Sequence, residues 1–148
     1  MAMDVHKLFE MSQEQLDDLF RKSPAGPIPD GATEGTAIVA PGTVFSPKIA
    51  AAVNLFAWQG KNFDAAHGVL RNRISAFGLN AIVAEVYKGP SWLDQKECIV
   101  IDYSKTSTVA QWIRDEIREI EPGTYLGEVY WEKKRLLHFA LQFKQPSS

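Results

Sequence analysis

The stretch Leu136-Leu137-His138-Phe139-Ala140-Leu141-Gln142-Phe143 decides the fold class. Large apolar residues alternate in it with smaller or polar ones, and alternation with a period of two is the pattern of a β-strand. One face of such a strand carries Leu137, Phe139, Leu141 and Phe143, and the other carries His138, Ala140 and Gln142. We therefore predict a strand in an antiparallel sheet, with the row of four large apolar side chains facing the core.

Further strands precede this one along the chain. Runs rich in Val, Ile and aromatic residues predict strands at 36–39, 80–88, 97–103 and 124–131, and we expect residues 62–78 to be strand as well. Glu132-Lys133-Lys134-Arg135 would join the last two strands as a hairpin loop, with its basic residues in solvent. Strands thus dominate the second half of the sequence.

Two short helices are predicted near the N-terminus. Ser12 and Gln15 have the spacing of a capping box, which indicates a helix over residues 12–22. Ser46-Pro47 is a typical start for a second helix, which would end by Gly60. Three prolines and three glycines in residues 24–35 predict an irregular connector between them.

Residues 107–120 fit two patterns. Apolar residues recur there at helical spacing, yet Glu116 to Ile120 followed by Pro122-Gly123 is also typical of a hairpin. We expect a helix near 107–115 that runs into a strand. The whole pattern predicts an α+β fold, mostly antiparallel β, arranged as a small barrel or a strongly curved sheet with two short helices near the N-terminus.

Composition indicates one globular domain over residues 1–148, with flexible ends at 1–11 and 144–148. Hydrophobic residues make up 45% of the 148 residues, which is ordinary for a globular protein. A net charge of −2 lacks the basic surplus of nucleic-acid-binding proteins. No apolar run is long enough to span a membrane and the first residues do not resemble a signal peptide, so we expect a cytoplasmic protein.

Familiar catalytic and cofactor motifs do not occur in the sequence. Gly60-Lys61 lacks the partners of a phosphate-binding loop, because Leu55 and Asn62 stand where Gly and Ser or Thr are needed. The three histidines are not paired at metal-binding spacing. The single cysteine, Cys98, lies in an apolar run and is predicted to be buried and unreactive. We expect no cofactor and no metal.

Candidate ligand-binding residues fall in two groups. Trp58, Lys61 and Phe63 could border a cavity, with Lys61 reaching an anionic head group; the alternative is a helix end with a solvated lysine. Asp102 and Tyr103 end a strand at a turn, where binding residues often lie. These five residues form one part of the predicted ligand-binding site.

Arg114, Arg118 and His138 complete the predicted site. Two arginines on one face repel, so an acidic group should lie between or above them. Asp102 could be an internal partner, and an anionic ligand group is the alternative; we favour the internal partner. His138 lies opposite the apolar row of its strand, either hydrogen-bonded to a neighbour or exposed to a binding site.

Trp58-Gln59-Gly60-Lys61-Asn62-Phe63 resembles a signature of uncharacterised bacterial proteins that contain a GXWXG domain. Further similarity to that group lies in Ile113-Arg114-Asp115, Pro122-Gly123, Leu126-Gly127 and the final aromatic strand. The resemblance implies a small calycin-like barrel. It implies no catalytic residue.

Aromatic residues, which make up 11% of the chain, favour a barrel that binds an apolar or amphipathic small molecule. Two alternatives stay open: a cofactor-independent enzyme (an isomerase, cyclase or hydrolase) on the same frame, and an interaction module without a ligand. A homodimer is compatible with each of the three.

Overall fold

The computed structural model describes residues 5–38, 60–74, 79–104 and 112–143. Within these ranges, the side chains of residues 5–6, 32, 34–38, 60–62, 70–74 and 79–83 lie outside the description. The predicted second helix, which would start at Ser46-Pro47, falls outside the described residues, as does Trp58.

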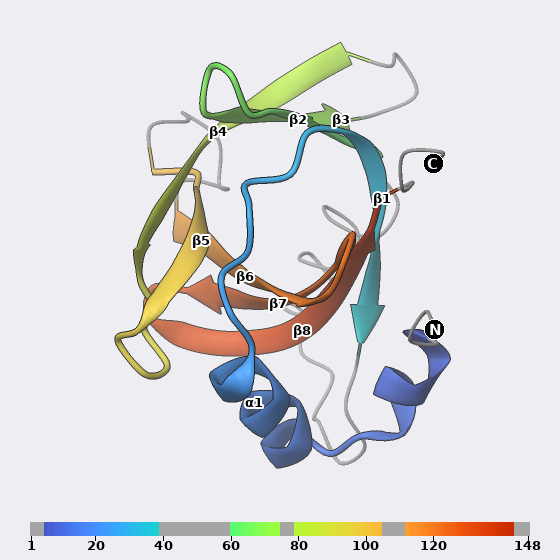
Figure 1. Ribbon diagram of the computed structural model, residues 1–148. Coiled ribbons are helices and arrows are strands. Elements are labelled where there is room, and N and C mark those ends of the chain that lie inside the picture. Colours follow the sequence, from blue (N-terminus) through green and yellow to red (C-terminus); the bar gives the residue numbers. More distant parts are fainter. Residues whose placement is uncertain (1–4, 39–59, 75–78, 105–111, 144–148) are drawn as a thin grey trace.

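Eight antiparallel strands form a closed barrel in chain order, so that β1 pairs with both β2 and β8 (Figure 1). A 3-10 helix and one α-helix precede them. The elements are η1 Val5–Glu10, α1 Gln13–Lys22, β1 Gly31–Ile38, β2 Gly60–Asp64, β3 Val69–Ile74, β4 Leu79–Pro90, β5 Glu97–Asp102, β6 Ile113–Glu121, β7 Thr124–Trp131 and β8 Lys134–Gln142. The prediction of a mostly antiparallel β-structure is confirmed.

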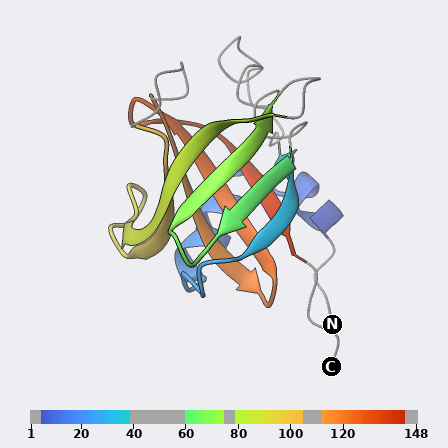
Figure 2. The same cartoon turned by 90° about the horizontal axis from the view of Figure 1, so that it is seen from above.

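Two apolar clusters lie on the two sides of the barrel wall. The inner cluster lies inside the barrel and includes Ile99, Ile101, Val129, Phe139 and Leu141. The outer cluster lies under α1 and includes Leu16, Phe20, Cys98, Val100 and Leu126. Strands β2–β4 form the opposite wall, away from α1 (Figure 2). The wall from β5 to β8 is therefore buried on both faces.

Helix α1 begins as the sequence predicts. Ser12 Oγ accepts a hydrogen bond from Gln15 N at 3.1 Å, and Gln15 Oε1 accepts one from Ser12 N at 2.9 Å. This reciprocal capping satisfies two backbone donors that the first turn leaves open. The apolar face of α1 then docks on the barrel through Leu16 and Phe20, both fully buried.

Strand β8 confirms the predicted alternation. Leu137, Phe139 and Leu141 are buried in the inner cluster, and Phe143, just after the strand, packs against it. The opposite face of β8 is also covered, because His138 and Ala140 lie buried beneath the N-terminal segment. His138 is thus more buried than the alternation of the sequence alone suggests.

The hairpin between β7 and β8 is tighter than predicted. Its turn consists of Glu132 and Lys133, whose φ angles of 50° and 74° lie in the left-handed region that closes two-residue hairpins. The prediction of a four-residue loop with three solvated basic residues is wrong for Arg135. This arginine belongs to β8, and its side chain turns toward α1.

Two other predictions need correction. Residues 31–35 belong to β1 rather than to an irregular connector, because the prolines that break regular structure all precede Gly31. Residues 113–115 begin β6 and are not helical, since pairing with β5 and β7 overrides their helical spacing. Residues 5–10, within the end predicted to be flexible, form η1, and its Leu8 is buried in the outer cluster.

Residues 24–30, here called the strap, run from α1 across one end of the barrel (Figure 1). Backbone N–H of Glu119 donates to Pro24 O at 3.0 Å, and Tyr125 Oη donates to Pro27 O at 2.6 Å. Ala25 and Ile28 pack against the inner cluster. The strap therefore closes this end of the barrel.

Close contact between strap and wall requires glycine at one position. Gly26 has a φ of +73°, and a Cβ there would lie 2.6 Å from the Cβ of Glu119. Any larger residue would be strained in this backbone conformation and would also push the strap away from β6.

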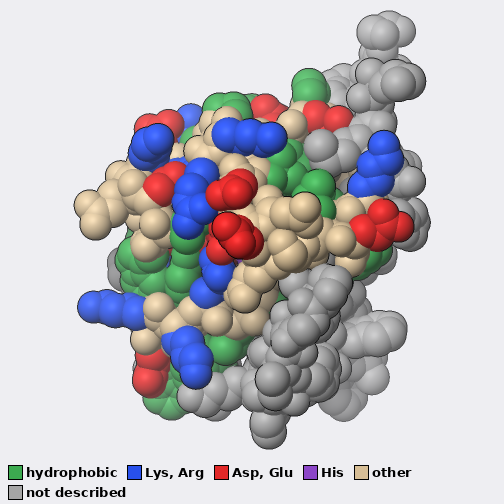
Figure 3. All heavy atoms as spheres, turned by 90° about the horizontal axis from the view of Figure 1, so that it is seen from below, with side chains coloured by type: hydrophobic (Ala, Val, Ile, Leu, Met, Phe, Trp, Pro, Cys, Tyr) green, Lys and Arg blue, Asp and Glu red, His purple; other side chains and the backbone are tan. Residues whose placement is uncertain are grey.

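The surface around α1 carries no single-sign patch. Figure 3 shows acidic and basic side chains interspersed on the face that carries the helix. Among the described residues, no helix is both long and apolar enough to cross a membrane.

Replacing Phe139 by Ala should lower the free energy of unfolding by about 3–5 kcal/mol, because the ring is buried and crosses Gly127 of the neighbouring strand. Denaturant titration measures this loss. The exposed Gln142, three residues later in the same strand and on the other face, gives the matched variant Gln142→Ala, for which we expect a change below about 0.5 kcal/mol. Equal effects of the two substitutions would refute the assignment of the faces.

Candidate functional site

A row of three buried ionisable residues crosses the outer face of the barrel. Glu116 on β6 lies opposite Glu128 on β7, and Glu128 lies opposite His138 on β8. All three are at most 1% exposed. Two carboxylates at directly paired strand positions repel each other, so each needs its own donors or cations.

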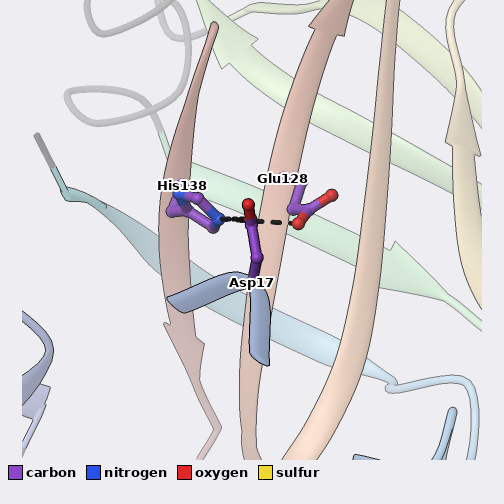
Figure 4. Close-up of side chains that lie close together, drawn as sticks. All are labelled: Asp17, Glu128 and His138. Carbon is purple, nitrogen blue, oxygen red and sulfur yellow. Dashed lines mark hydrogen bonds and ion pairs between the residues drawn. The ribbon is translucent and has the colours of Figure 1, made fainter. Parts of the chain in front are cut away.

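Asp17 of α1 lies against Glu128 and His138, so that the three side chains are in contact (Figure 4). His138 Nε2 lies 2.9 Å from Asp17 Oδ1 and 3.5 Å from Glu128 Oε1. Arg135 Nη1 donates to Asp17 Oδ1 and lies 3.6 Å from Glu128 Oε1. Tyr130 Oη donates to Glu128 Oε2 at 2.7 Å. We call Asp17, Glu128, Arg135 and His138 the four-residue cluster.

Charges in this cluster balance only when His138 is protonated, since Asp17 and Glu128 then face two cations. Burial disfavours the imidazolium, but the two carboxylates outweigh it and raise the pKa of His138 above 6.5. Burial likewise disfavours ionised Asp17, yet its bonds to His138 and Arg135 hold the pKa of the carboxyl below 3.8. Both shifts favour the fully charged form.

The cluster has the residue types of a metal site. One ligand atom from each of Asp17, Glu128 and His138 lies within 4.8 Å of the other two. A metal ion at their centre would have to compete with Arg135, whose guanidinium already contacts one carboxylate and lies beside the other. Since the guanidinium supplies the positive charge, the arrangement fits an ion-pair network better than a metal centre.

Arg118 forms a second anchor on the same face. Its guanidinium is 1% exposed, and five hydrogen bonds occupy its five N–H groups. Asp94 accepts two of them, at 2.8 Å and 2.7 Å, and Phe20 O at the end of α1 accepts another at 2.9 Å. The bonds from Arg118 lower the pKa of Asp94. The remaining acceptors are Lys96 O and Glu97 O.

Glu116 fixes the loop between β4 and β5. It accepts hydrogen bonds from Ser91 Oγ at 2.6 Å and from Trp92 N at 2.8 Å, while Arg114 Nε lies 3.1 Å away. The guanidinium of Arg114 stacks on the Trp92 ring at 4.4 Å. Trp92 is 42% exposed and borders an open groove of about 480 Å³ with Pro90, Ser91, Gln95 and Lys133.

Asp115 points the other way, into the barrel. Its partners across the sheet are Ile101 and Val129, and its strand neighbours on the same face are Ile113 and Ile117, all four members of the inner cluster. The carboxyl group is fully buried. An ionisable group is costly to bury in an apolar interior and is therefore a candidate for function.

The predicted site residues do not form one group. Phe63 and Tyr103 lie in the inner cluster, whereas Arg114, Arg118 and His138 lie on the outer face. Asp102 accepts a hydrogen bond from Tyr87 Oη at 2.8 Å and does not contact Arg118. Lys61 belongs to β2, but its side chain, like the whole of Trp58, lies outside the described residues.

Arg118 has an internal partner, as preferred, but this partner is Asp94 and not Asp102, which instead lies opposite Arg114 across the sheet. Asp94 takes that place because the loop folds back over β6, which spacing along the chain does not reveal. Glu116 lies between the two arginines, as expected, because residues 114, 116 and 118 share one face of a strand.

Sequence reasoning missed Asp17, Asp94, Glu128 and Arg135, and it did not separate Asp115 from its neighbours. A signal existed for Asp115, because Ile113-Arg114-Asp115-Glu116-Ile117 alternates if it is read as a strand. Asp17 carried no such signal, since an acidic residue in the first half of a helix is also explained by the helix dipole.

Comparison with known proteins gives fold information alone. No protein-family model matches the sequence, and no curated protein matches it. A crystal structure of a protein from Thermomonospora curvata is similar, with a TM-score of 0.65 and 15% sequence identity over 95% of this chain and 93% of that chain.

Replacing Arg118 by Leu should lower the free energy of unfolding by about 3 kcal/mol or more, because Asp94 and three backbone carbonyls would lose a donor. The loss should be independent of any added small molecule. Arg21→Leu is the matched control, since Arg21 pairs with Asp18 at the surface and should matter by less than about 1 kcal/mol. Normal stability of the Arg118 variant would contradict its role as an anchor.

Cys98 should resist thiol reagents in the native protein. It is buried, and burial together with the nearby Glu116 raises the pKa of the thiol to about 12. We expect no stoichiometric labelling by a disulfide reagent under native conditions and one labelled thiol per chain in denaturant. Rapid native labelling would show that the outer cluster opens readily.

Proposed function

We propose that this chain is a small calycin-like barrel that binds an apolar or amphipathic small molecule in its interior. The observation that carries this proposal is the buried carboxyl group of Asp115, which lies on the inner face among the apolar neighbours Ile101, Ile113, Ile117 and Val129. An eight-stranded barrel has an interior just wide enough for side chains or one small ligand. A carboxyl group on that wall offers a polar contact to a molecule bound in the interior.

The closed end of the barrel supports the same proposal. The strap covers it, and Phe63, Tyr125 and Phe143 pack beneath, with ring centroids 5.5 Å apart for Phe63 and Phe143 and 5.7 Å apart for Tyr125 and Phe143. An apolar ligand would lie above this aromatic base, shielded from water. Asp115, farther along the wall, would accept hydrogen bonds from the polar part of the ligand, since a carboxylate can accept several.

The buried position of Asp115 also favours a second candidate, a cofactor-independent enzyme on the same frame. A carboxyl group held in an apolar enclosure can move a proton to or from a bound molecule, as an isomerase, cyclase or hydrolase requires. Under this reading, Asp115→Asn would retain the ligand and lose turnover. Under simple binding, the same variant would change affinity alone.

Native mass spectrometry of protein purified without detergent tests for a retained ligand, and Nile red serves as an uncharged probe. We expect one saturable Nile red site per chain. Ala84→Leu should weaken binding at least about fivefold, because Ala84 is a small, buried member of the inner cluster and a larger side chain there would take up interior volume.

Trp92→Ala is the matched control, since Trp92 borders the outer groove and not the interior. Probe binding unchanged in this variant and weakened in Ala84→Leu supports the interior site. Binding that depends on Trp92 instead, or no saturable binding and no retained molecule, would overturn the proposal.

A further inference from the structure

The four-residue cluster joins the single α-helix of the described chain to the barrel wall. Asp17 comes from α1, Glu128 from β7, and Arg135 and His138 from β8. Two further titratable groups lie beside the cluster through Glu128: Tyr130 of β7 donates to it, and Glu116 of β6 lies opposite it across the sheet. Burial, and next the charge of Glu128, raise the pKa of Tyr130, so this phenol stays neutral throughout the ordinary pH range.

Only one member of this cluster changes charge near neutral or mildly alkaline pH. Arginine does not deprotonate in proteins, and the bonds to His138 and Arg135 hold the pKa of Asp17 below 3.8. Loss of the proton from His138 would leave two buried carboxylates facing one guanidinium. The group would then carry a net negative charge in a site with little access to water.

We propose that the four-residue cluster is a protonation-controlled latch, which holds α1 on the barrel while His138 is an imidazolium and weakens when it becomes neutral. The direction follows from linkage. Because the pKa of His138 is raised in the folded protein, its contribution is complete below about pH 6.5 and is lost as the pH rises through the folded pKa.

The contribution of Asp17 to stability depends on pH in the opposite sense, and it changes at a much lower pH than that of His138. Its pKa is lowered by folding, so its contribution is present above about 3.8 and is lost as the pH falls through the folded value. The second anchor, Arg118 to Phe20 O, does not titrate and keeps the end of α1 near the wall. Alkaline release should therefore loosen the helix without unfolding the barrel.

The strap gives this latch a consequence beyond the helix. It starts at Pro24, directly after the helix cap at Ser23, and crosses the closed end of the barrel. If the barrel interior holds a ligand, as proposed above, loosening α1 would loosen one end of the cover over that ligand. The latch itself does not depend on a ligand being present.

Two measurements on the full chain test the latch. The first is an NMR titration of the His138 imidazole, for which we expect a pKa above 6.5. The second is limited proteolysis by trypsin after Arg21 and Lys22, both exposed near the end of α1. Cleavage rates between about pH 6 and 9 are divided by those of a synthetic peptide of residues 13–30, which corrects for the pH dependence of the protease.

For the natural protein we expect the normalised cleavage rate to rise between about pH 6 and 9. The rise should be about tenfold for each unit by which the pKa of His138 in the folded protein exceeds its pKa in the unfolded chain. His138→Gln cannot be charged and should be cleaved rapidly at every pH, without a step. His67→Gln is the matched control, because His67 is exposed and pairs with Asp64 in the β2–β3 turn. It should keep the step.

Should His138→Gln fail to fold, judged by near-ultraviolet circular dichroism, Asp17→Asn replaces it, since this change removes the carboxylate that α1 contributes to the cluster and leaves the barrel side chains intact. It too should abolish the step. A His138 pKa below 6.5, or a step that persists in either cluster variant, would overturn the latch. These outcomes are independent of Nile red binding, so the latch and the interior site can fail separately.

Discussion

The covering of the outer barrel face depends on Arg118. Its planar guanidinium makes hydrogen bonds in a fixed geometry, and its acceptors come from α1, from the side chain of Asp94 and from the backbone at residues 96 and 97. The Phe20 ring lies against the guanidinium at 4.5 Å. Apolar burial of Leu16 and Phe20 supplies most of the driving force for docking α1. Arg118 determines where along the barrel that docking occurs.

Adjacent residues of strand β6 place one carboxyl group on the inner face of the barrel and another on the outer face. Asp115 faces the apolar interior and Glu116 faces the polar row, although only one peptide bond lies between them. The inner carboxyl group is a candidate for binding or proton transfer, and the outer one positions the loop that carries Trp92. A shift of one residue in the register of β6 would exchange the two carboxyl groups and disrupt both sites. Pairing with β5 and β7 on either side fixes that register.

Similarity to the Thermomonospora curvata protein extends over nearly the whole length of both chains, but at 15% identity it concerns the fold. Many unrelated activities occur on shared small barrels, so function has to be argued from side chains. Here the informative side chains are ionisable groups that the fold buries. Asp115 lies inside the barrel and the four-residue cluster lies outside it.

By itself, the sequence determined the local elements. The alternation in residues 136–143, the capping box at Ser12 and Gln15, and the apolar run around Cys98 each act over a few residues, and each appears in the structure as predicted. Tertiary structure decided the partners. Asp17 meets His138 across 121 positions of the chain, and Arg118 meets Phe20 across 98. Such contacts depend on how α1 crosses the closed barrel, and side-chain periodicity carries no information about separations of that length. The same reason explains residues 113–115, whose helical spacing was overridden by hydrogen bonds to two neighbouring strands, β5 and β7.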